Sequence, residues 1–230
     1  KSMTIQHLIR LELKKTPFRK YILLSALAIV LGIFFLLASI TDSSDTVHDF
    51  NNAFQSAEMI FACIFIVFFA VLNGELVISE YNNRTILLMF TYPVDKKKMI
   101  AAKLVVITLF IVLSLVVGYT CCGLFLIGID RKFDLLADTF SAAVLRYFIV
   151  RSATTIVVFC CLGLWTFAAG MLRKSVTVTI VSSMLFILLR QLVIASGREP
   201  RESPGVVLVA AMITAVSLWF TFRRKITELE

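Results

Sequence analysis

Residues 21–40 read YILLSALAIVLGIFFLLASI and contain no charged side chain. A helix of about 20 residues rises about 30 Å, which matches the hydrocarbon thickness of a bilayer. This stretch therefore predicts a transmembrane helix. It is longer than the apolar core of a secretory signal, and the following residues 41–45 (TDSSD) offer no convincing cleavage motif, so we expect the helix to be retained.

The composition of the whole chain agrees with this interpretation. Of the 230 residues, 59% are hydrophobic and 17% are charged, whereas a soluble domain is about half apolar and about a quarter charged. The sequence predicts an all-α, polytopic membrane protein with a single transmembrane domain. The six predicted spans are residues 21–40, 57–78, 104–126, 152–172, 175–196 and 205–222.

Two segments outside these spans are amphipathic. Residues 4–20 mix apolar and basic side chains, which predicts an interfacial helix with its basic groups at the lipid headgroups. Residues 133–147 carry apolar side chains at helical spacing, which predicts a short helix on the outer membrane surface.

The distribution of positive charge predicts the orientation. With the N-terminus inside, the inner segments hold 16 Lys and Arg residues and the outer segments hold 6. Because basic residues concentrate on the cytoplasmic side of a membrane, both termini are predicted to be cytoplasmic. The net charge of +8 has the same explanation, so we expect no nucleic-acid partner.

The sequence shows no catalytic or metal-binding motif. The five cysteines lie inside apolar runs, and His7 and His48 are isolated from each other. No GxxxxGK[ST] phosphate loop is present, so we expect this chain to bind no cofactor and to hydrolyse no ATP by itself.

Three charged residues fall within the predicted spans. Glu75 lies near the inner end of the second span, where it could act at the inner mouth or pair with a basic group of the interfacial helix. Arg190 lies near the outer end of the fifth span, where its side chain could reach the interface. Glu58 lies at the outer rim of the second span and is predicted to be solvated.

The segment between the second and third spans is longer than a simple connection needs to be. Residues 79–103 read SEYNNRTILLMFTYPVDKKKMIAAK. Residues 85–92 are amphipathic enough to form a short helix, which Pro93 would end, and Asp95 could cap the next helix. A structured segment that is apolar in its middle and basic at its end is typical of a docking surface for a cytoplasmic partner.

This segment resembles the ABC-2 family of ABC transporter permeases, whose second and third spans are joined by a pattern E-x-x-x-G/R-T … P-V-S-R … K. The matching residues here are Glu80, Arg84-Thr85, Pro93-Val94, Lys97 and Lys103. Arg84 stands where Gly is common, and Asp95-Lys96 replaces Ser-Arg. The basic N-terminal helix and the six spans resemble the same family.

The resemblance implies a coupling helix, within residues 79–98, that sits in a groove of a separate ATPase subunit. The residues implied in coupling are Glu80, Tyr81, Arg84, Thr85, Leu88, Tyr92, Pro93 and Lys97. It also implies two ATPase subunits that carry ATP and Mg²⁺, and a second permease copy, identical or related. The alternative for this segment is an amphipathic helix that rests on lipid.

The small size and short outer loops are most similar to bacterial permeases of antimicrobial-peptide export and immunity, such as lantibiotic, bacitracin-type and cytolytic-peptide exporters. The expected function is ATP-driven export of an amphipathic or hydrophobic cargo across the bacterial plasma membrane. The alternatives are a permease for a lipid-like or drug cargo, a non-transporting scaffold or sensor that docks a cytoplasmic partner, and an ion-coupled carrier.

Overall fold

The computed structural model describes residues 9–10, 18–42, 50–78, 96–133, 142–173, 175–195, 211–219 and 221, and within these ranges every residue except Ser175 is helical. The elements are α2 (Phe18–Asp42), α3 (Phe50–Asn73), the π-helix η1 (Gly74–Ile78), α5 (Lys96–Phe133), α6 (Ala142–Arg173) and α7 (Val176–Ala195). Residues 211–219 form a further stretch, called here the C-terminal helical segment. The predicted all-α class is confirmed for the part of the chain that the structure describes.

Four of the described helices are long and apolar enough to cross a bilayer, namely Arg19–Ser39, Ala53–Ile78, Lys98–Asp130 and Val144–Arg173. They contain most of the first four predicted spans. Val176–Leu189 is a shorter apolar helix at the position of the predicted fifth span. The fold is therefore that of a polytopic membrane protein, while the fifth and sixth spans stay predictions.

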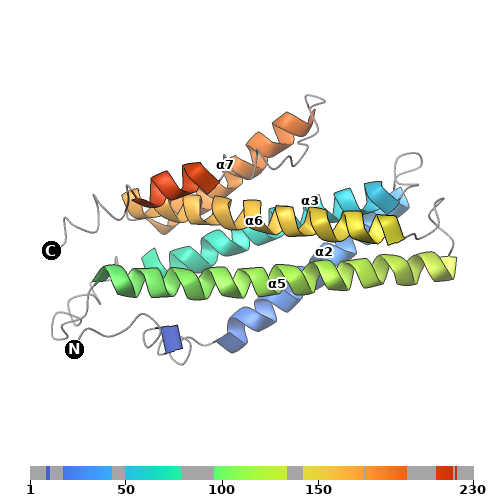
Figure 1. Ribbon diagram of the computed structural model, residues 1–230, viewed down its shortest axis with the longest axis horizontal. Coiled ribbons are helices and arrows are strands. Elements are labelled where there is room, and N and C mark those ends of the chain that lie inside the picture. Colours follow the sequence, from blue (N-terminus) through green and yellow to red (C-terminus); the bar gives the residue numbers. More distant parts are fainter. Residues whose placement is uncertain are drawn as a thin grey trace.

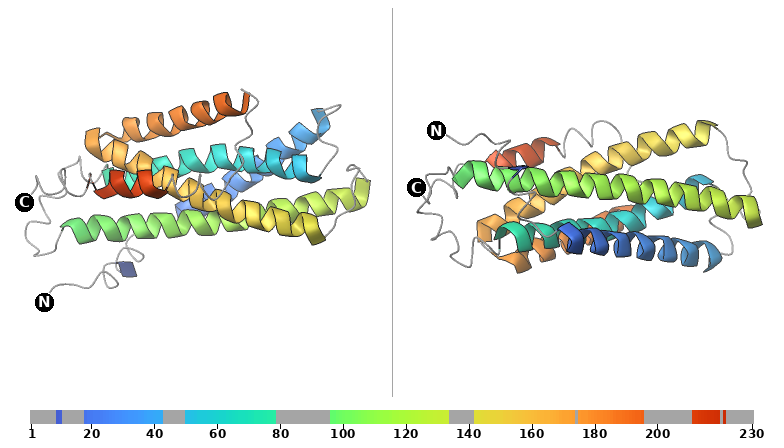
Figure 2. Two further views of the ribbon diagram at one scale, coloured as in Figure 1. Left: turned by 45° about the horizontal axis from the view of Figure 1, so that its top comes forward. Right: turned by 90° about the horizontal axis from the view of Figure 1, so that it is seen from below.

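The helices run along one long axis, and α3 is the central one (Figure 1). It packs against α2, α5, α6 and α7. The views in Figure 2 show the same lengthwise bundle from two further sides. The start of α5, the end of α6 and η1 gather at one end, called here the Glu75 end. The end of α5 and the start of α6 lie at the other, called the Glu58 end.

Aromatic side chains of α3 fill the core. Phe61, Phe65 and Phe69 are almost completely buried. Phe61 lies between two glycines, because a Cβ atom would stand 3.0 Å from its ring at Gly32 of α2 and 3.1 Å at Gly118 of α5. Small residues that let a large ring approach a neighbouring backbone are a common way to pack helices in lipid, where van der Waals contact replaces the hydrophobic driving force.

Glycines also bring α6 and α7 close to α3. A Cβ atom at Gly163 would overlap the Phe69 ring, and one at Gly170 would overlap the Thr179 side chain. At Gly74 a Cβ atom would come within 2.6 Å of Val176 Cγ1. The elements α3, η1, α6 and α7 therefore pack more closely than larger residues would allow.

The outer faces of the bundle are apolar. Large apolar side chains are exposed along one face of α2, including Leu23, Val30 and Phe34, and along α5, including Leu109 and Leu113. A soluble protein rarely exposes such continuous apolar surface. These faces suit lipid or another apolar helix.

Several predicted boundaries differ from the structure. Residues 142–147 of the predicted outer surface helix belong to α6, so they continue directly into the predicted fourth span instead of forming a separate element. No Gly or Pro occurs between residues 142 and 162 to end a helix there. Phe133 ends α5, and residues 134–141 lie outside the described residues.

The first and third spans also lie within longer helices than predicted. The helix α2 begins at Phe18, so the last three residues of the predicted interfacial helix belong to it. The helix α5 begins at Lys96, before the predicted start at residue 104, and its first residues include a run of lysines. The polar flank of α2 was predicted as part of a separate interfacial helix, although it continues α2. The start of α5 at Lys96 agrees with the prediction that a helix follows Asp95.

Candidate functional site

The predicted coupling residues from Glu80 to Pro93 lie outside the described residues. Lys97 lies in the first turn of α5, but its side chain is not described. The structure does describe the two helices that flank residues 79–95. Ile78 ends η1 on one side, and Lys96 begins α5 on the other.

The helix that precedes this segment changes its geometry over its last five described residues. Residues Gly74–Ile78 form a π-helix that follows α3 directly. A π-helical turn is rare, is less favourable than an α-helical one and often lies at a functional site. Gly74 is the one residue type that permits the close approach to Val176. The end of α3 is therefore shaped by a local irregularity.

Glu75 is the acidic residue of this π-helix. Its carboxylate lies close enough to the hydroxyl of Tyr21, near the start of α2, for the two groups to interact. Tyr21 is buried and Glu75 is exposed. The contact links α2 to η1 at the Glu75 end of the bundle.

Lys103 of α5 approaches η1 from the other side. Its Nζ atom donates a hydrogen bond to the carbonyl oxygen of Leu76 at 3.2 Å. The side chain is only 4% exposed. The sequence motif placed Lys103 at the opening of the third span but did not show that it is buried against the preceding helix.

Asn73 is a second polar residue that the sequence analysis missed. It is fully buried in the last turn of α3, and its Nδ2 atom lies 3.5 Å from the carbonyl oxygen of Gly163 in α6. Its Oδ1 atom has no hydrogen-bond partner in the described part of the chain. The sequence signal for this buried polar residue was an Asn inside the apolar run that precedes Gly74.

A separate polar cluster lies toward the Glu58 end. Arg151 of α6 donates through Nε to Glu58 Oε2 of α3 at 2.5 Å, and Thr155 donates to Glu58 Oε1. Arg151 also donates to the Tyr147 hydroxyl at 2.8 Å. Glu58 is only 4% exposed, so the prediction that it is solvated was wrong. Sequence alone did not show that Arg151 faces it across the interface between α3 and α6.

Arg190 lies in α7, and its side chain is not described. Within the described residues no group of three or more His, Cys, Asp or Glu side chains could hold a metal ion. None of the polar clusters among the described residues has the composition of a metal site. They are candidates for holding helices together or for transmitting movement between them.

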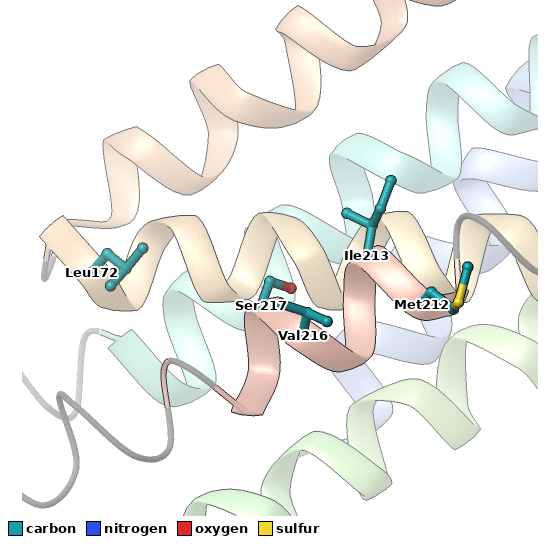
Figure 3. A pocket seen from close by; sticks show the side chains of 5 residues that line it. All are labelled: Leu172, Met212, Ile213, Val216 and Ser217. Carbon is teal, nitrogen blue, oxygen red and sulfur yellow. The ribbon is translucent and has the colours of Figure 1, made fainter.

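An apolar groove lies on the surface of the bundle between the end of α6 and the C-terminal helical segment (Figure 3). It has a volume of about 450 Å³ and is lined by Leu172, Met212, Ile213, Val216 and Ser217. Its lining is almost entirely apolar, so it suits an acyl chain or an apolar side chain rather than a charged ligand.

Comparison with known proteins decides the family. A family model of ABC-2 family transporter proteins matches residues 8–190, which include the first four predicted spans and the segment between α3 and α5. The chain belongs to the ABC-2 transporter family. ABC-2 proteins are membrane components of ABC transporters and typically work with separate ATPase subunits, as the resemblance implied.

A relative supports the same assignment over almost the whole chain. This ABC-2 protein is 32% identical to the uncharacterized protein YcbO of Bacillus subtilis (strain 168) over 227 residues. The match covers 94% of this chain and 95% of the relative. The similarity therefore extends beyond the segment between α3 and α5 to almost the whole length of the chain.

Proposed function

We propose that this ABC-2 protein is the permease subunit of an ATP-driven exporter in a bacterial plasma membrane, with both termini in the cytoplasm. Two separate ATPase subunits would bind ATP and Mg²⁺ and dock on residues 79–95. A second permease copy, identical or related, would complete the pathway. The cargo would be amphipathic or hydrophobic, such as a lantibiotic or another membrane-active peptide.

The observation that carries this proposal is the arrangement of the helices that flank residues 79–95. The π-helix η1, which continues α3, precedes this segment and α5 follows it, and these elements pack against each other at the Glu75 end. A partner that binds between these anchors would act on α3 and α5 at once. Because α3 packs against α2, α6 and α7, a displacement of α3 would also move these helices.

The mechanism follows from this connection. Closure of two ATPases around ATP would move the docked segments relative to each other. Each segment would pass the displacement through η1 and the start of α5 into the bundle. The apolar path would then open toward the outside or the outer leaflet as the two permeases change their contact.

The described interior supports an apolar cargo. Its core side chains are mainly Phe, Leu and Ile, and Glu58 is paired with Arg151. A path for an ion or a sugar would need several polar groups facing a cavity. Among the described residues, the buried polar side chains are mostly Ser and Thr, whose small hydroxyl groups leave the interior mainly apolar.

The proposal is tested by replacing Glu80, Arg84 and Tyr92 together with Ala. We expect the variant to reach the membrane and to lose both copurification with its ATPase and cargo-stimulated ATP hydrolysis. A matched triple Ala variant of Asp45, His48 and Asp49, in the predicted outer loop, should retain both.

Retention of ATPase binding and stimulated hydrolysis by the first triple variant would refute the coupling role of residues 79–95. An ATPase that binds the wild-type chain but is stimulated by no cargo from a panel of membrane-active peptides, lipids and drugs would favour the scaffold or sensor alternative.

A further inference from the structure

Lys103 occupies an unusual place for a lysine near a membrane surface. A lysine at the end of a span usually extends its ammonium group into the headgroup region. Lys103 instead is buried, and its Nζ atom reaches the Leu76 carbonyl oxygen on a different helix. An ammonium group that gives up water in this way must be compensated by specific acceptors.

The acceptor belongs to an irregular turn. Leu76 lies in the π-helix η1, which continues α3. A π-helical turn is rare, and a backbone carbonyl oxygen has two lone pairs, so it can accept a side-chain donor beside any backbone partner. Lys103 therefore supplies η1 with a charged donor from α5.

The same turn is held from a second direction. Glu75 precedes Leu76, and its carboxylate lies within interaction range of the Tyr21 hydroxyl of α2. Side chains from α2 and α5 thus both reach η1. Tyr21 of α2 interacts with Glu75, and Lys103 of α5 donates to Leu76. Side-chain links from two neighbouring helices would restrict the direction in which the chain leaves the bundle.

We propose that Lys103 is a positioning residue for ATPase coupling. By donating to Leu76, it holds η1 against α5, so that a displacement of residues 79–95 moves both helices together. This inference rests on the proposed function. It adds that coupling requires Lys103, which lies outside the docking segment itself.

The test compares Lys103→Met with Lys103→Arg in proteoliposomes that contain the ATPase copurified with the wild-type chain. Lys103→Met keeps most of the apolar stem and removes the donor. We expect ATPase binding within about twofold of wild type, an unchanged KM for ATP, and a permease-dependent increase in kcat reduced about tenfold, which is a typical magnitude for coupling between sites. Lys103→Arg keeps a charged donor and should retain most of the increase.

Lys20→Met is the matched control, because Lys20 is exposed near the start of α2 and its loss removes the same charge at the same end of the bundle. It should leave the increase in kcat unchanged. If Lys103→Met is not recovered from membranes, Tyr21→Phe tests the second link, since it removes only a hydroxyl. We expect this variant to bind the ATPase and to show a reduced increase in kcat.

Full stimulation by Lys103→Met, or by Tyr21→Phe where the first variant is not recovered, would overturn the inference while leaving the proposed function intact. Equal loss in Lys103→Met and Lys103→Arg, or loss of ATPase binding by Lys103→Met, would also overturn the assigned role. Failure of the wild-type chain to bind any ATPase would instead refute the proposed function.

Discussion

At the scale of single residues, the contact between Glu58 and Arg151 ties together two helices that are distant in sequence. The two residues are separated by 93 positions, and Thr155, one turn beyond Arg151, adds a second donor to the same carboxylate. A buried carboxylate that keeps its charge needs such partners, because burial without them is strongly unfavourable. The pair therefore fixes the register of α6 against α3.

Loss of the Arg151 charge alone should lower the free energy of unfolding more than loss of the charges of both Arg151 and Glu58. We expect Arg151→Met to lower the free energy of unfolding by about 3 kcal/mol, because it leaves the Glu58 carboxylate buried without its cation. The double variant Glu58→Gln with Arg151→Met should recover part of this loss. Thermal unfolding in detergent, followed by circular dichroism, measures both effects.

The control for this cycle is Arg146→Met, since Arg146 lies on the same helix with its side chain exposed. It should change stability by less than about 0.5 kcal/mol, as expected for a surface substitution. Additive effects of Glu58→Gln and Arg151→Met would contradict a coupled pair.

The residue scale also shows the limit of sequence reasoning at the site. The motif from Glu80 to Lys103 led to the family, which the comparison confirmed. It did not reveal that Lys103 donates to Leu76 of η1 or that Arg151 faces Glu58, because both facts depend on which helices lie side by side. Hydropathy shows that a segment can span the membrane, but it does not show which other helices lie beside that segment.

At the scale of elements, close packing of α6 on α3 depends on Gly163. We expect Gly163→Ala to destabilise the protein by about 1–3 kcal/mol, because the new methyl group must displace the Phe69 ring in a filled core. Thermal unfolding in detergent checks the magnitude.

Gly128→Ala is the matched control on α5, since nothing lies within 4 Å of a Cβ atom built at Gly128. This variant should change stability by less than about 1 kcal/mol, mainly through helix propensity. Equal effects of the two substitutions would show that Gly163 is not required for the packing of α6.

Helix type was predictable because long apolar runs without Pro leave no alternative in lipid. Helix length was less predictable. Arg146 was assigned to a separate outer helix and Arg151 to the gap between that helix and the fourth span, although α6 runs through both positions. The π-helix at Gly74–Ile78 left no clear signal beyond Gly74 itself.

At the scale of the whole molecule, residues 79–95 are flanked by η1 and α5, which contact each other. The π-helix η1 continues the central helix α3. The residues that would contact the ATPase therefore lie in direct sequence continuity with the most connected element of the bundle. ABC-2 proteins typically work with separate ATPase subunits, and this continuity would give such a subunit a route to the core.

The central claim is that the ATPase docks on residues 79–95, and site-specific photo-crosslinking tests it most directly. A photoreactive amino acid at Leu88, in the predicted coupling helix, should form a covalent adduct with the ATPase subunit in native membranes. The same group at Leu113, which is exposed on the apolar face of α5, should form none. An ATPase that copurifies with the chain but is crosslinked from Leu113 and not from Leu88 would contradict the account.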